Sequence, residues 1–439
     1  MKSLLFARFG SPSVLRIEEL PIPEAGEGEA LVHVKTAAIN PADIANVADP
    51  STTQLFREPP AGTLRAPLSR ASDAKEMRGK MEKQIGRFAK TWLCMGLVAA
   101  IGIVCRARAQ NGRVKFVVDP NWPKPLPGKW VIGQVSGVCV DAQDHVFIVN
   151  RNDMTDKEAE VAQQAPPYIE FDPEGNVVNS FGDWKVVPNI THGCTIDYEN
   201  NFWTAGNGDG IIQKYSHDGK LLLQIGVRGV VDTSDGTLKG RALNSSHSQF
   251  YMPSAIAVDP ANGNIYVADG YGNSRIVVFD RSGKFLRQWG HLGTKEEADA
   301  GVGGAFMQVV HCVVIGNDGL IYVCDRQADR IQVFDKIGNF KNNIWIKRGN
   351  SLPDNWGTTW WIGFSPDREQ KYMYVDDGGD EQVKILDHAS GKVLSGFGRP
   401  GHQIGEFTHG HTLAVDSIGN VYVAETDWGR RVQKFEPVK

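Results

Sequence analysis

The sequence lacks three features that would each have indicated a common class of protein. It has no CxxC pair, no GxGxxG loop after a strand and no long run of like charge. The first absence argues against a zinc site built from cysteines, and the second argues against a dinucleotide-binding domain. The formal net charge is only −4, so no global basic field would recruit nucleic acid or anionic lipid.

Cysteine and histidine are both scarce, with 6 and 11 residues in a chain of 439. Cys312 and Cys324 flank the turn Asn317-Asp318-Gly319 symmetrically, so they could face each other across one hairpin. Two interpretations stay open: a disulfide bond across the hairpin, or two buried thiols that act as small hydrophobic side chains. Glycine is abundant by contrast, with 48 residues, and this suits many short strands joined by turns.

The first 48 residues alternate short strand-like segments with turns that contain proline or glycine. They resemble the opening strands of medium-chain quinone or alcohol dehydrogenases, through Arg8-Phe9-Gly10-Ser11-Pro12, the turn around Pro21 and Pro23, and Ala38-Ile39-Asn40-Pro41-Ala42-Asp43. A piece of this size cannot bury a core of its own, and no cofactor domain follows it. We therefore interpret residues 1–48 as a fused fragment or a start-site artefact without dehydrogenase activity.

Residues 49–80 are polar and without periodicity, so we expect a disordered linker. Residues 81–110 then combine a basic flank, an apolar stretch over 91–105 and the ending Ala107-Arg108-Ala109. These are the three parts of a secretory signal peptide, and the apolar stretch is short for a spanning helix, which needs about 20 residues.

The position of this segment is unusual for a signal peptide, and three interpretations stay open. Translation could begin near Met77 or Met81, the segment could remain as a membrane anchor, or it could form a buried core helix. In the first two cases the rest of the chain works outside the cytoplasm, as a periplasmic, secreted or membrane-anchored protein.

From residue 111 onward the chain repeats itself six times, at intervals of about 50–60 residues. Each repeat has an alternating apolar stretch, a turn, a second strand, a polar loop and a third strand. Radial stacking of such units removes long exposed sheet edges. The pattern predicts an all-β fold, a six-bladed β-propeller over residues 111–439, preceded by a short extension that is not part of it. We expect residues 114–118 to supply the outer strand of the last blade and close the ring.

One position, where the first strand of each blade begins at the mouth of the central channel, is equivalent in all six repeats. It is occupied by Ser136, His192, Ser254, His311, Trp360 and His411. Histidine thus occurs in alternate blades, which are related by about a third of a turn, so three imidazoles should converge on the axis. Three neutral imidazoles with an open fourth position are the ligands of a catalytic zinc ion. We interpret the other histidines as solvated, among them His33, His145, His217 and His388.

Two loops should open beside these histidines. The loop of the third blade offers Tyr271, and the long loop of the first blade offers Arg151. A tyrosine next to a dication can act as a base, and an arginine can hold a carboxylate or a developing oxyanion. For each residue the alternative is structural, namely packing against a neighbour for Tyr271 and a solvated charge for Arg151.

Over nearly all of residues 111–439 the sequence resembles the peptidyl-α-hydroxyglycine α-amidating lyase family, whose fold is a propeller of NHL repeats. The resemblance is strongest at residues 133–138, 151–153, 251–253, 269–277 and 282–290. It implies that His192, His311 and His411 are zinc ligands, that Tyr271 is the catalytic base and that Arg151 is the active-site arginine.

The chain also departs from this family. The resemblance implies a structural calcium ion held by the backbone carbonyls of Val138 and Cys194 and by one Asp, but Thr412 stands at the Asp position. This removes the only charged ligand and puts calcium in doubt. His409 replaces a Met near the zinc, and it could close the site as a fourth ligand or tune the choice of substrate. The family's paired cysteines are absent, because Tyr251 and Gly272 stand at the places of one pair.

The resemblance implies a zinc-dependent carbon–nitrogen lyase that cleaves an N-acyl-α-hydroxyglycine type of substrate to an amide and glyoxylate. The alternatives are a non-catalytic NHL propeller that binds a partner, and a metal-dependent hydrolase of the gluconolactonase type. A scaffold does not need three histidines, and the hydrolases typically use carboxylates and Asn as ligands. We expect a monomer that acts on a small-molecule or peptide substrate, without a nucleic-acid partner. Membrane contact is expected only through residues 91–105, if that segment is not cleaved.

Overall fold

The computed structural model describes residues 2–5, 16–19, 114–231, 244–347 and 356–438. The chain divides into two units, Met1–Arg106 and Ala107–Lys439. In the first unit the described residues form one antiparallel hairpin of β1 (Lys2–Leu5) and β2 (Arg16–Glu19). The predicted linker over 49–80 and the signal-like segment over 81–110 lie outside the described residues. Within the described part of the chain, no helix combines the length and the apolar character needed to span a membrane.

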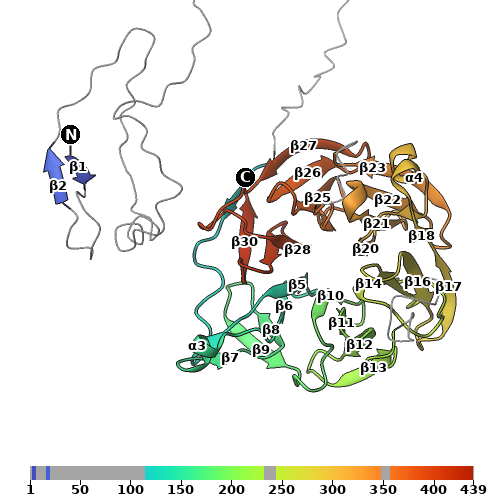
Figure 1. The fold of residues 1–439 in the computed structure, drawn as a ribbon, viewed down its shortest axis with the longest axis horizontal. Coiled ribbons are helices and arrows are strands. Elements are labelled where there is room, and N and C mark those ends of the chain that lie inside the picture. The colour runs from blue at the N-terminus through green and yellow to red at the C-terminus, as the bar shows by residue number, and fades with distance from the viewer. Residues whose placement is uncertain (1, 6–15, 20–113, 232–243, 348–355, 439) are drawn as a thin grey trace, which may run out of the picture. The chain divides into compact units, whose positions relative to one another are not determined.

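The second unit is a six-bladed β-propeller, as the repeats predicted (Figure 1). Every blade is an antiparallel sheet of four strands. The first strands, nearest the axis, are β5 (Val135–Val140), β10 (Thr191–Ile196), β14 (Pro253–Val258), β20 (Val310–Ile315), β24 (Trp361–Phe364) and β28 (Gly410–Val415). The second strands are β6 (Val146–Asn150), β11 (Phe202–Gly206), β15 (Ile265–Asp269), β21 (Ile321–Asp325), β25 (Tyr372–Asp377) and β29 (Val421–Glu425).

The outer half of each blade completes the sheet. The third strands are β8 (Tyr168–Phe171), β12 (Ile211–Tyr215), β16 (Arg275–Phe279), β22 (Arg330–Phe334), β26 (Gln382–Asp387) and β30 (Arg431–Pro437). The fourth strands, at the rim, are β9 (Val177–Phe181), β13 (Leu221–Ile225), β17 (Phe285–Trp289), β23 (Phe340–Trp345), β27 (Lys392–Phe397) and β3 (Phe116–Val118). The fourth strands carry most of the exposed positions, because they have no sheet beyond them.

Short elements fill the loops between strands. Two parallel pairs are formed by β4 (Trp130–Val131) with β7 (Gln163–Gln164) and by β18 (His291–Leu292) with β19 (Ala305–Phe306). Among the described residues the helices are α3 (Asp156–Ala159), α4 (Lys295–Ala300) and the 3-10 turn η3 (Arg326–Ala328). Both α-helices begin with a threonine whose side chain and a glutamate three residues later cap each other's backbone N–H groups.

The ring closes between the two ends of the propeller. β3 pairs in antiparallel fashion with β30, so the last blade takes its outer strand from the beginning of the unit. This confirms the closing role expected for residues 114–118. Because the strand from one end completes a sheet that begins at the other end, the first and the last blade are held together by backbone hydrogen bonds.

An aromatic side chain recurs near the start of the second strand in every blade. All six are buried, and they are Phe147, Trp203, Tyr266, Tyr322, Tyr374 and Tyr422. They reach across the seam between blades: the Phe147 ring centroid lies 5.8 Å from that of Phe202 in the second blade. The Tyr322 ring similarly lies 5.1 Å from Phe364 in the fifth blade. Neighbouring blades therefore share their hydrophobic cores, which makes the packing of each depend on the next.

Two disulfide bonds lie in the propeller. Cys312–Cys324 joins β20 to β21 within one blade, so the first of the two interpretations of this pair is the one observed. Cys139–Cys194 joins β5 of the first blade to β10 of the second, and this bond was not expected from the sequence. The two cysteines are 55 residues apart, and only the stacking of neighbouring blades brings their strands together.

We predict that loss of the Cys139–Cys194 bond lowers the free energy of unfolding by about 2–4 kcal/mol, because the bond closes a long loop in the unfolded chain. Loss of Cys312–Cys324, which spans only 12 residues, should cost about 1 kcal/mol less by the same argument. Denaturant unfolding of the two double alanine variants measures both losses.

The same comparison under reducing conditions is the control, since it measures only the packing lost with the sulfur atoms. A larger loss for the short loop than for the long one, after this correction, would contradict the prediction.

Candidate metal centre and active site

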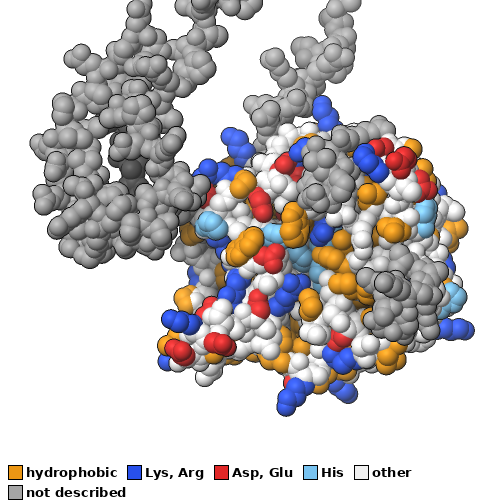
Figure 2. Space-filling view, viewed as in Figure 1, with side chains coloured by type: hydrophobic (Ala, Val, Ile, Leu, Met, Phe, Trp, Pro, Cys, Tyr) orange, Lys and Arg blue, Asp and Glu red, His pale blue; other side chains and the backbone are white. Residues whose placement is uncertain are grey.

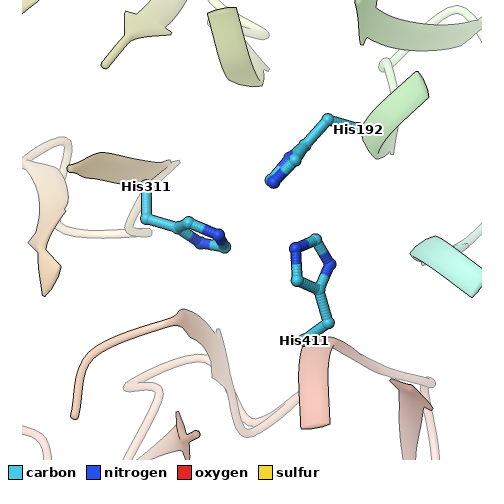
Figure 3. A group of neighbouring side chains, drawn as sticks. All are labelled: His192, His311 and His411. Atoms are coloured by element: carbon cyan, nitrogen blue, oxygen red, sulfur yellow. The ribbon is translucent and has the colours of Figure 1, made fainter. Parts of the chain in front are cut away.

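Three histidines converge on the propeller axis, each from the first strand of a different blade (Figure 3). His192 lies in β10, His311 in β20 and His411 in β28, and their exposed fractions are 1%, 0% and 3%. The ring centroid of His192 lies 4.8 Å from that of His311 and 4.5 Å from that of His411. The centroids of His311 and His411 are 5.1 Å apart. The structure thus brings together the three residues that the sequence singled out.

A β-bulge at the start of the first strand accompanies each of these side chains. The register of pairing shifts between His192 and Cys194, between Val310 and Val313, and between Gly410 and Thr412. A bulge bends its strand and changes the direction of a side chain that would otherwise alternate between the two faces of the sheet. The backbone irregularity therefore accounts for the common aim of the three imidazoles.

The Nδ1 atom of each imidazole is bound to a backbone carbonyl of the following blade. The distances are 2.7 Å from His192 to Ser254, 2.5 Å from His311 to Trp360 and 3.1 Å from His411 to Ser136. These three acceptors occupy the remaining three positions of the sixfold register described above. A carbonyl can only accept, so each Nδ1 donates its hydrogen and each Nε2 keeps a free lone pair.

Burial keeps the three imidazoles uncharged. It lowers the pKa of His192 to about 3 and the pKa values of His311 and His411 well below their usual range. The mutual repulsion of the rings and the positive charge of Arg151 act in the same direction. The histidines are therefore neutral at physiological pH, and neutral imidazole is the form that binds a metal ion.

The ligand atoms of these histidines lie within 4.8 Å of one another. Three neutral nitrogen donors, each oriented by a carbonyl, fit a divalent transition-metal ion. The centre could therefore hold such an ion, and the donor set leaves a fourth position for another ligand.

Tyr271 lies directly over the histidines. Its hydroxyl oxygen is 3.2 Å from Nε2 of His192 and 2.9 Å from Nε2 of His311. The loop that carries it is fixed by Tyr251, whose carbonyl accepts from the backbone N–H of Gly272 at 3.0 Å. A Cβ atom on Gly272 would lie 2.2 Å from Cδ1 of Tyr251, so the ring packs against a bare backbone. Tyr251 and Gly272 stand where the amidating lyases have a pair of cysteines, and here they are in direct contact.

Arg326 is a member of the site that the sequence analysis missed. It is buried in η3 and donates from Nη1 to the Tyr271 hydroxyl at 3.2 Å. Its guanidinium also lies 4.8 Å from the ring centroid of Trp360. The residue follows the second strand of the fourth blade, as Arg151 and Tyr271 follow second strands of theirs. The argument used for those two loops would have found Arg326 if it had been applied to every blade.

Arg151 is a fixed part of the site and not a solvated charge. Its Nε donates to the carbonyl of Thr191 at 3.2 Å, and its Nη1 donates to Oε1 of Gln134 at 2.8 Å. Burial lowers the pKa of Arg151, against the opposing charges of Tyr271 and Asp427. A guanidinium that has lost hydration in this way gains more from an anionic ligand.

His409 lies beside the metal centre but is engaged elsewhere. Its Nε2 is 2.9 Å from Oδ2 of Asp427, and its ring centroid is 5.1 Å from Trp356 and 4.9 Å from Trp360. It is not among the residues whose ligand atoms cluster with the three histidines. In this geometry His409 is part of the wall of the pocket and does not supply a fourth metal ligand.

A pocket of about 230 Å³ opens at the centre, lined by Tyr271, His411, His409 and the two arginines Arg151 and Arg326. Tryptophan side chains form part of its wall. Histidine atoms are visible near the middle of the ring in Figure 2, with hydrophobic and charged side chains around them. Two guanidiniums beside aromatic rings suit a ligand that combines an anionic group with an apolar part.

The residues named for a calcium site lie on the channel wall. Val138 and Cys194 belong to β5 and β10 and line a cavity of about 500 Å³. The backbone N–H of Val138 donates to the hydroxyl of Thr412 at 3.1 Å. Thr412, which stands at the Asp position, thus bonds to a backbone N–H, and the expectation that the calcium site is lost stays a prediction.

The fold and the centre define the class of this protein, a six-bladed β-propeller that carries three converging histidines. The family model of the NHL repeat matches residues 250–279. Human NHL repeat-containing protein 3 is 27% identical over 74% of this chain and 85% of its own length. Among solved structures, a streptogramin B lyase superposes with a TM-score of 0.47 at 12% identity, over 74% of this chain and 98% of that one.

Other relatives of this chain are named as amidating enzymes. A probable peptidyl-α-hydroxyglycine α-amidating lyase of Caenorhabditis elegans is 26% identical over 68% of this chain and 81% of its own length. Peptidyl-glycine α-amidating monooxygenase B of Xenopus laevis is 28% identical over 75% of this chain, which spans only 36% of the length of that relative. The resemblance to the amidating lyases that the sequence motifs indicated is thereby confirmed.

We predict that the metal-free protein loses stability as the pH falls below about 6.5, the usual pKa of an exposed histidine. The unfolded chain then takes up protons at the three imidazoles, whereas the folded chain keeps them neutral because its pKa values are depressed. Proton uptake thus stabilises the unfolded state and lowers the free energy of unfolding. By about pH 5 each histidine should lower the free energy of unfolding by up to about 2 kcal/mol.

Denaturant unfolding of the metal-free parent and of His411→Gln, between about pH 7 and pH 5, measures this effect. The variant lacks one of the three imidazoles. The slope of its unfolding free energy against pH should therefore be smaller than that of the parent by the uptake of about one proton. The difference between the two proteins removes the groups that titrate in both. Equal slopes would contradict the neutral state of the buried imidazoles.

Proposed function

We propose that the propeller is a zinc-dependent carbon–nitrogen lyase that acts on an N-acyl-α-hydroxyglycine type of substrate. The observation that carries this proposal is the arrangement of three neutral imidazoles under the Tyr271 hydroxyl, with Arg151 and Arg326 in the same pocket. The similarity to relatives that are named as amidating lyases supports the choice of reaction.

His192, His311 and His411 would hold the zinc ion through Nε2, since each Nδ1 is occupied by a carbonyl. When bound, zinc would polarise the hydroxyl group of the substrate and make its proton easier to remove.

Arg151 would bind the carboxylate of the substrate. Two of its donors are already used on Thr191 and Gln134, which fixes the plane of the guanidinium before the substrate arrives. The remaining donors can form charge-assisted hydrogen bonds with a carboxylate. This preorganisation orients the hydroxyl-bearing carbon toward the tyrosine.

Tyr271 would act as the base through its phenolic oxygen. Arg326 donates to that oxygen and stabilises negative charge on it. The proton would move from the substrate hydroxyl to the phenolate oxygen of Tyr271, which becomes a phenol, and the electron pair of the O–H bond would form the carbonyl of glyoxylate. The C–N bond breaks, its electron pair stays on nitrogen, and the proton passes from Tyr271 to that nitrogen to complete the amide.

We predict that His192→Ala, His311→Ala and His411→Ala each remove about one equivalent of zinc, because two imidazoles hold the ion far less tightly than three. Elemental analysis of the purified protein measures the content. His291→Ala is the matched control, since this histidine is exposed at the rim and should change nothing. Retention of the parent's zinc in all three variants would exclude the proposed centre.

We predict that Tyr271→Phe lowers the turnover of α-hydroxyhippurate by about 10²–10⁴-fold, which is the usual contribution of general acid–base catalysis. Zinc content should not change, because the phenol is not one of the three ligands. Arg151→Lys keeps the charge but loses the planar fork, so KM should rise more than kcat falls. Release of glyoxylate measures both effects.

Tyr198→Phe is the control for these measurements, because Tyr198 is exposed and outside the pocket. A parent protein that holds zinc but releases no glyoxylate would refute the lyase. It would favour instead a hydrolase of another substrate or a propeller that only binds a partner, the two alternatives left open by the sequence.

A further inference from the structure

A second group of metal-type ligands lies at the other end of the first blade. Asp141, His145, Glu170 and His217 bring one ligand atom each to within 4.8 Å of one another. Asp141 follows β5 and is five residues beyond Ser136, which accepts from His411, so the group lies about 17 Å along the strand from the active site. His145 and His217, which the sequence predicted to be solvated, keep 30% and 39% of their side-chain surface exposed, but both also face this group.

The contacts within the group are short. Nδ1 of His145 lies 2.6 Å from Oε1 of Glu170 and 3.9 Å from Oδ2 of Asp141. Nε2 of His217 lies 3.2 Å from the same Glu170 oxygen and 3.4 Å from the same Asp141 oxygen. Two nitrogen and two oxygen atoms thus surround one small volume, and they come from two neighbouring blades.

The carboxylates are buried without enough partners. Glu170 is 1% exposed and the side chain of Asp141 is fully buried. Oε2 of Glu170 and Oδ2 of Asp141 accept no hydrogen bond in the described structure. A buried carboxylate oxygen that accepts no hydrogen bond is costly, and a cation close to it lowers this cost.

The second blade has a lysine at the position of Glu170. Glu170 lies opposite Phe147 in the sheet of the first blade, as Lys214 lies opposite Trp203 in the second. Lys214 Nζ is 3.0 Å from Oδ2 of Asp197, the turn residue equivalent to Asp141. The second blade therefore carries a built-in cation where the first blade has another carboxylate.

In the third blade the turn carboxylate is paired with a lysine from the fourth blade. Lys336, in the turn between β22 and β23, lies 2.8 Å from Oδ2 of the turn residue Asp259. His217 occupies the corresponding turn between β12 and β13 and faces Asp141 in the same way. In both comparisons a lysine contacts the buried turn carboxylate, and in the second blade Lys214 also lies 3.3 Å from the more exposed Glu199. In the first blade two buried carboxylates have only two imidazoles.

We infer that Asp141, His145, Glu170 and His217 form a second metal site, for a divalent transition-metal ion such as zinc. Two imidazole nitrogens and two carboxylate oxygens are the donors of a closed four-coordinate zinc site. A dication would balance the two carboxylates and bind the unpartnered oxygens. The site is structural, because all four positions are filled by protein.

The ion would join the first blade to the second. His217 belongs to the second blade, the other three residues belong to the first, and the disulfide Cys139–Cys194 links the same two blades. The Phe147 ring lies 5.5 Å from the His217 ring and packs the turn against the first blade. The seam between the first and the second blade would thus have two cross-links of different chemistry.

The test is a count of metal ions in the full-length protein, stripped with a chelator and reloaded with zinc alone. The parent should bind about two equivalents, and Glu170→Lys about one, because the lysine reproduces the arrangement of the second blade. His217→Ala should also bind about one equivalent. Because the two variants change residues in different blades, the same loss in both would not be explained by a folding defect in one of them. His388→Ala, a histidine in neither group, is the control and should bind as the parent does.

The active-site variant His311→Ala separates this proposal from the proposed function. It should keep about one equivalent, and His311→Ala combined with Glu170→Lys should keep none. In the His311→Ala background a chelator should lower the thermal midpoint by several degrees, and this shift should vanish with Glu170→Lys. If Glu170→Lys and His217→Ala both bind as much zinc as the parent, the second site does not exist and the two imidazoles balance the carboxylates as cations. Loss of zinc in these two but not in His311→Ala would instead overturn only the active centre.

Discussion

The closure of the ring by β3 and β30 is the constraint on which the rest of the structure depends. Only in a closed ring do first strands from blades far apart in sequence meet at one axis. This is what allows three histidines to bind the same metal ion. The same closure supplies their orientation, because each imidazole is tied by Nδ1 to a carbonyl of the following blade. For His411 that following blade is the first one, and its bond to Ser136 crosses the seam that the closing strand seals. The closed ring therefore holds the three imidazoles in the orientation that a metal ion would need.

The two histidine groups of the propeller differ in charge, and this separates their chemistry. The axial group consists of neutral imidazoles with arginines nearby, so a bound dication would keep its positive charge and attract an anionic substrate. The group at Asp141 adds two carboxylates, which would neutralise the same ion. An ion whose charge is neutralised and whose positions are filled is suited to holding strands together. An ion held by neutral ligands beside an open pocket is suited to polarising a substrate.

The periodicity of the sequence was sufficient to predict six blades, the closing strand and the register that places His192, His311 and His411 together. These features follow from a repeat, which can be read along one chain. The disulfide within one hairpin was at least a defined alternative, because Cys312 and Cys324 flank a local turn. Cys139–Cys194 and the contacts of His145 and His217 could not be predicted in this way. They depend on which side chains face each other across the seam between blades, and that depends on the twist and stagger of the packed sheets. Arg326 was missed for a different reason, since the loop after the second strand was considered only in the first and third blades.

The departures from the amidating lyases change the surroundings of the centre and leave the three histidines in place. Tyr251 packs on Gly272 where a cysteine pair is expected, so the loop that carries Tyr271 is held by an aromatic ring and backbone hydrogen bonds. His409 is held by Asp427 and by two tryptophans, and burial lowers its pKa while Asp427 opposes this shift. For His409 to bind the metal it would have to break the bond to Asp427 and leave that carboxylate beside an aromatic wall. This cost favours a role for His409 in the shape and polarity of the pocket, where it would select among substrates by the group next to the hydroxyl-bearing carbon.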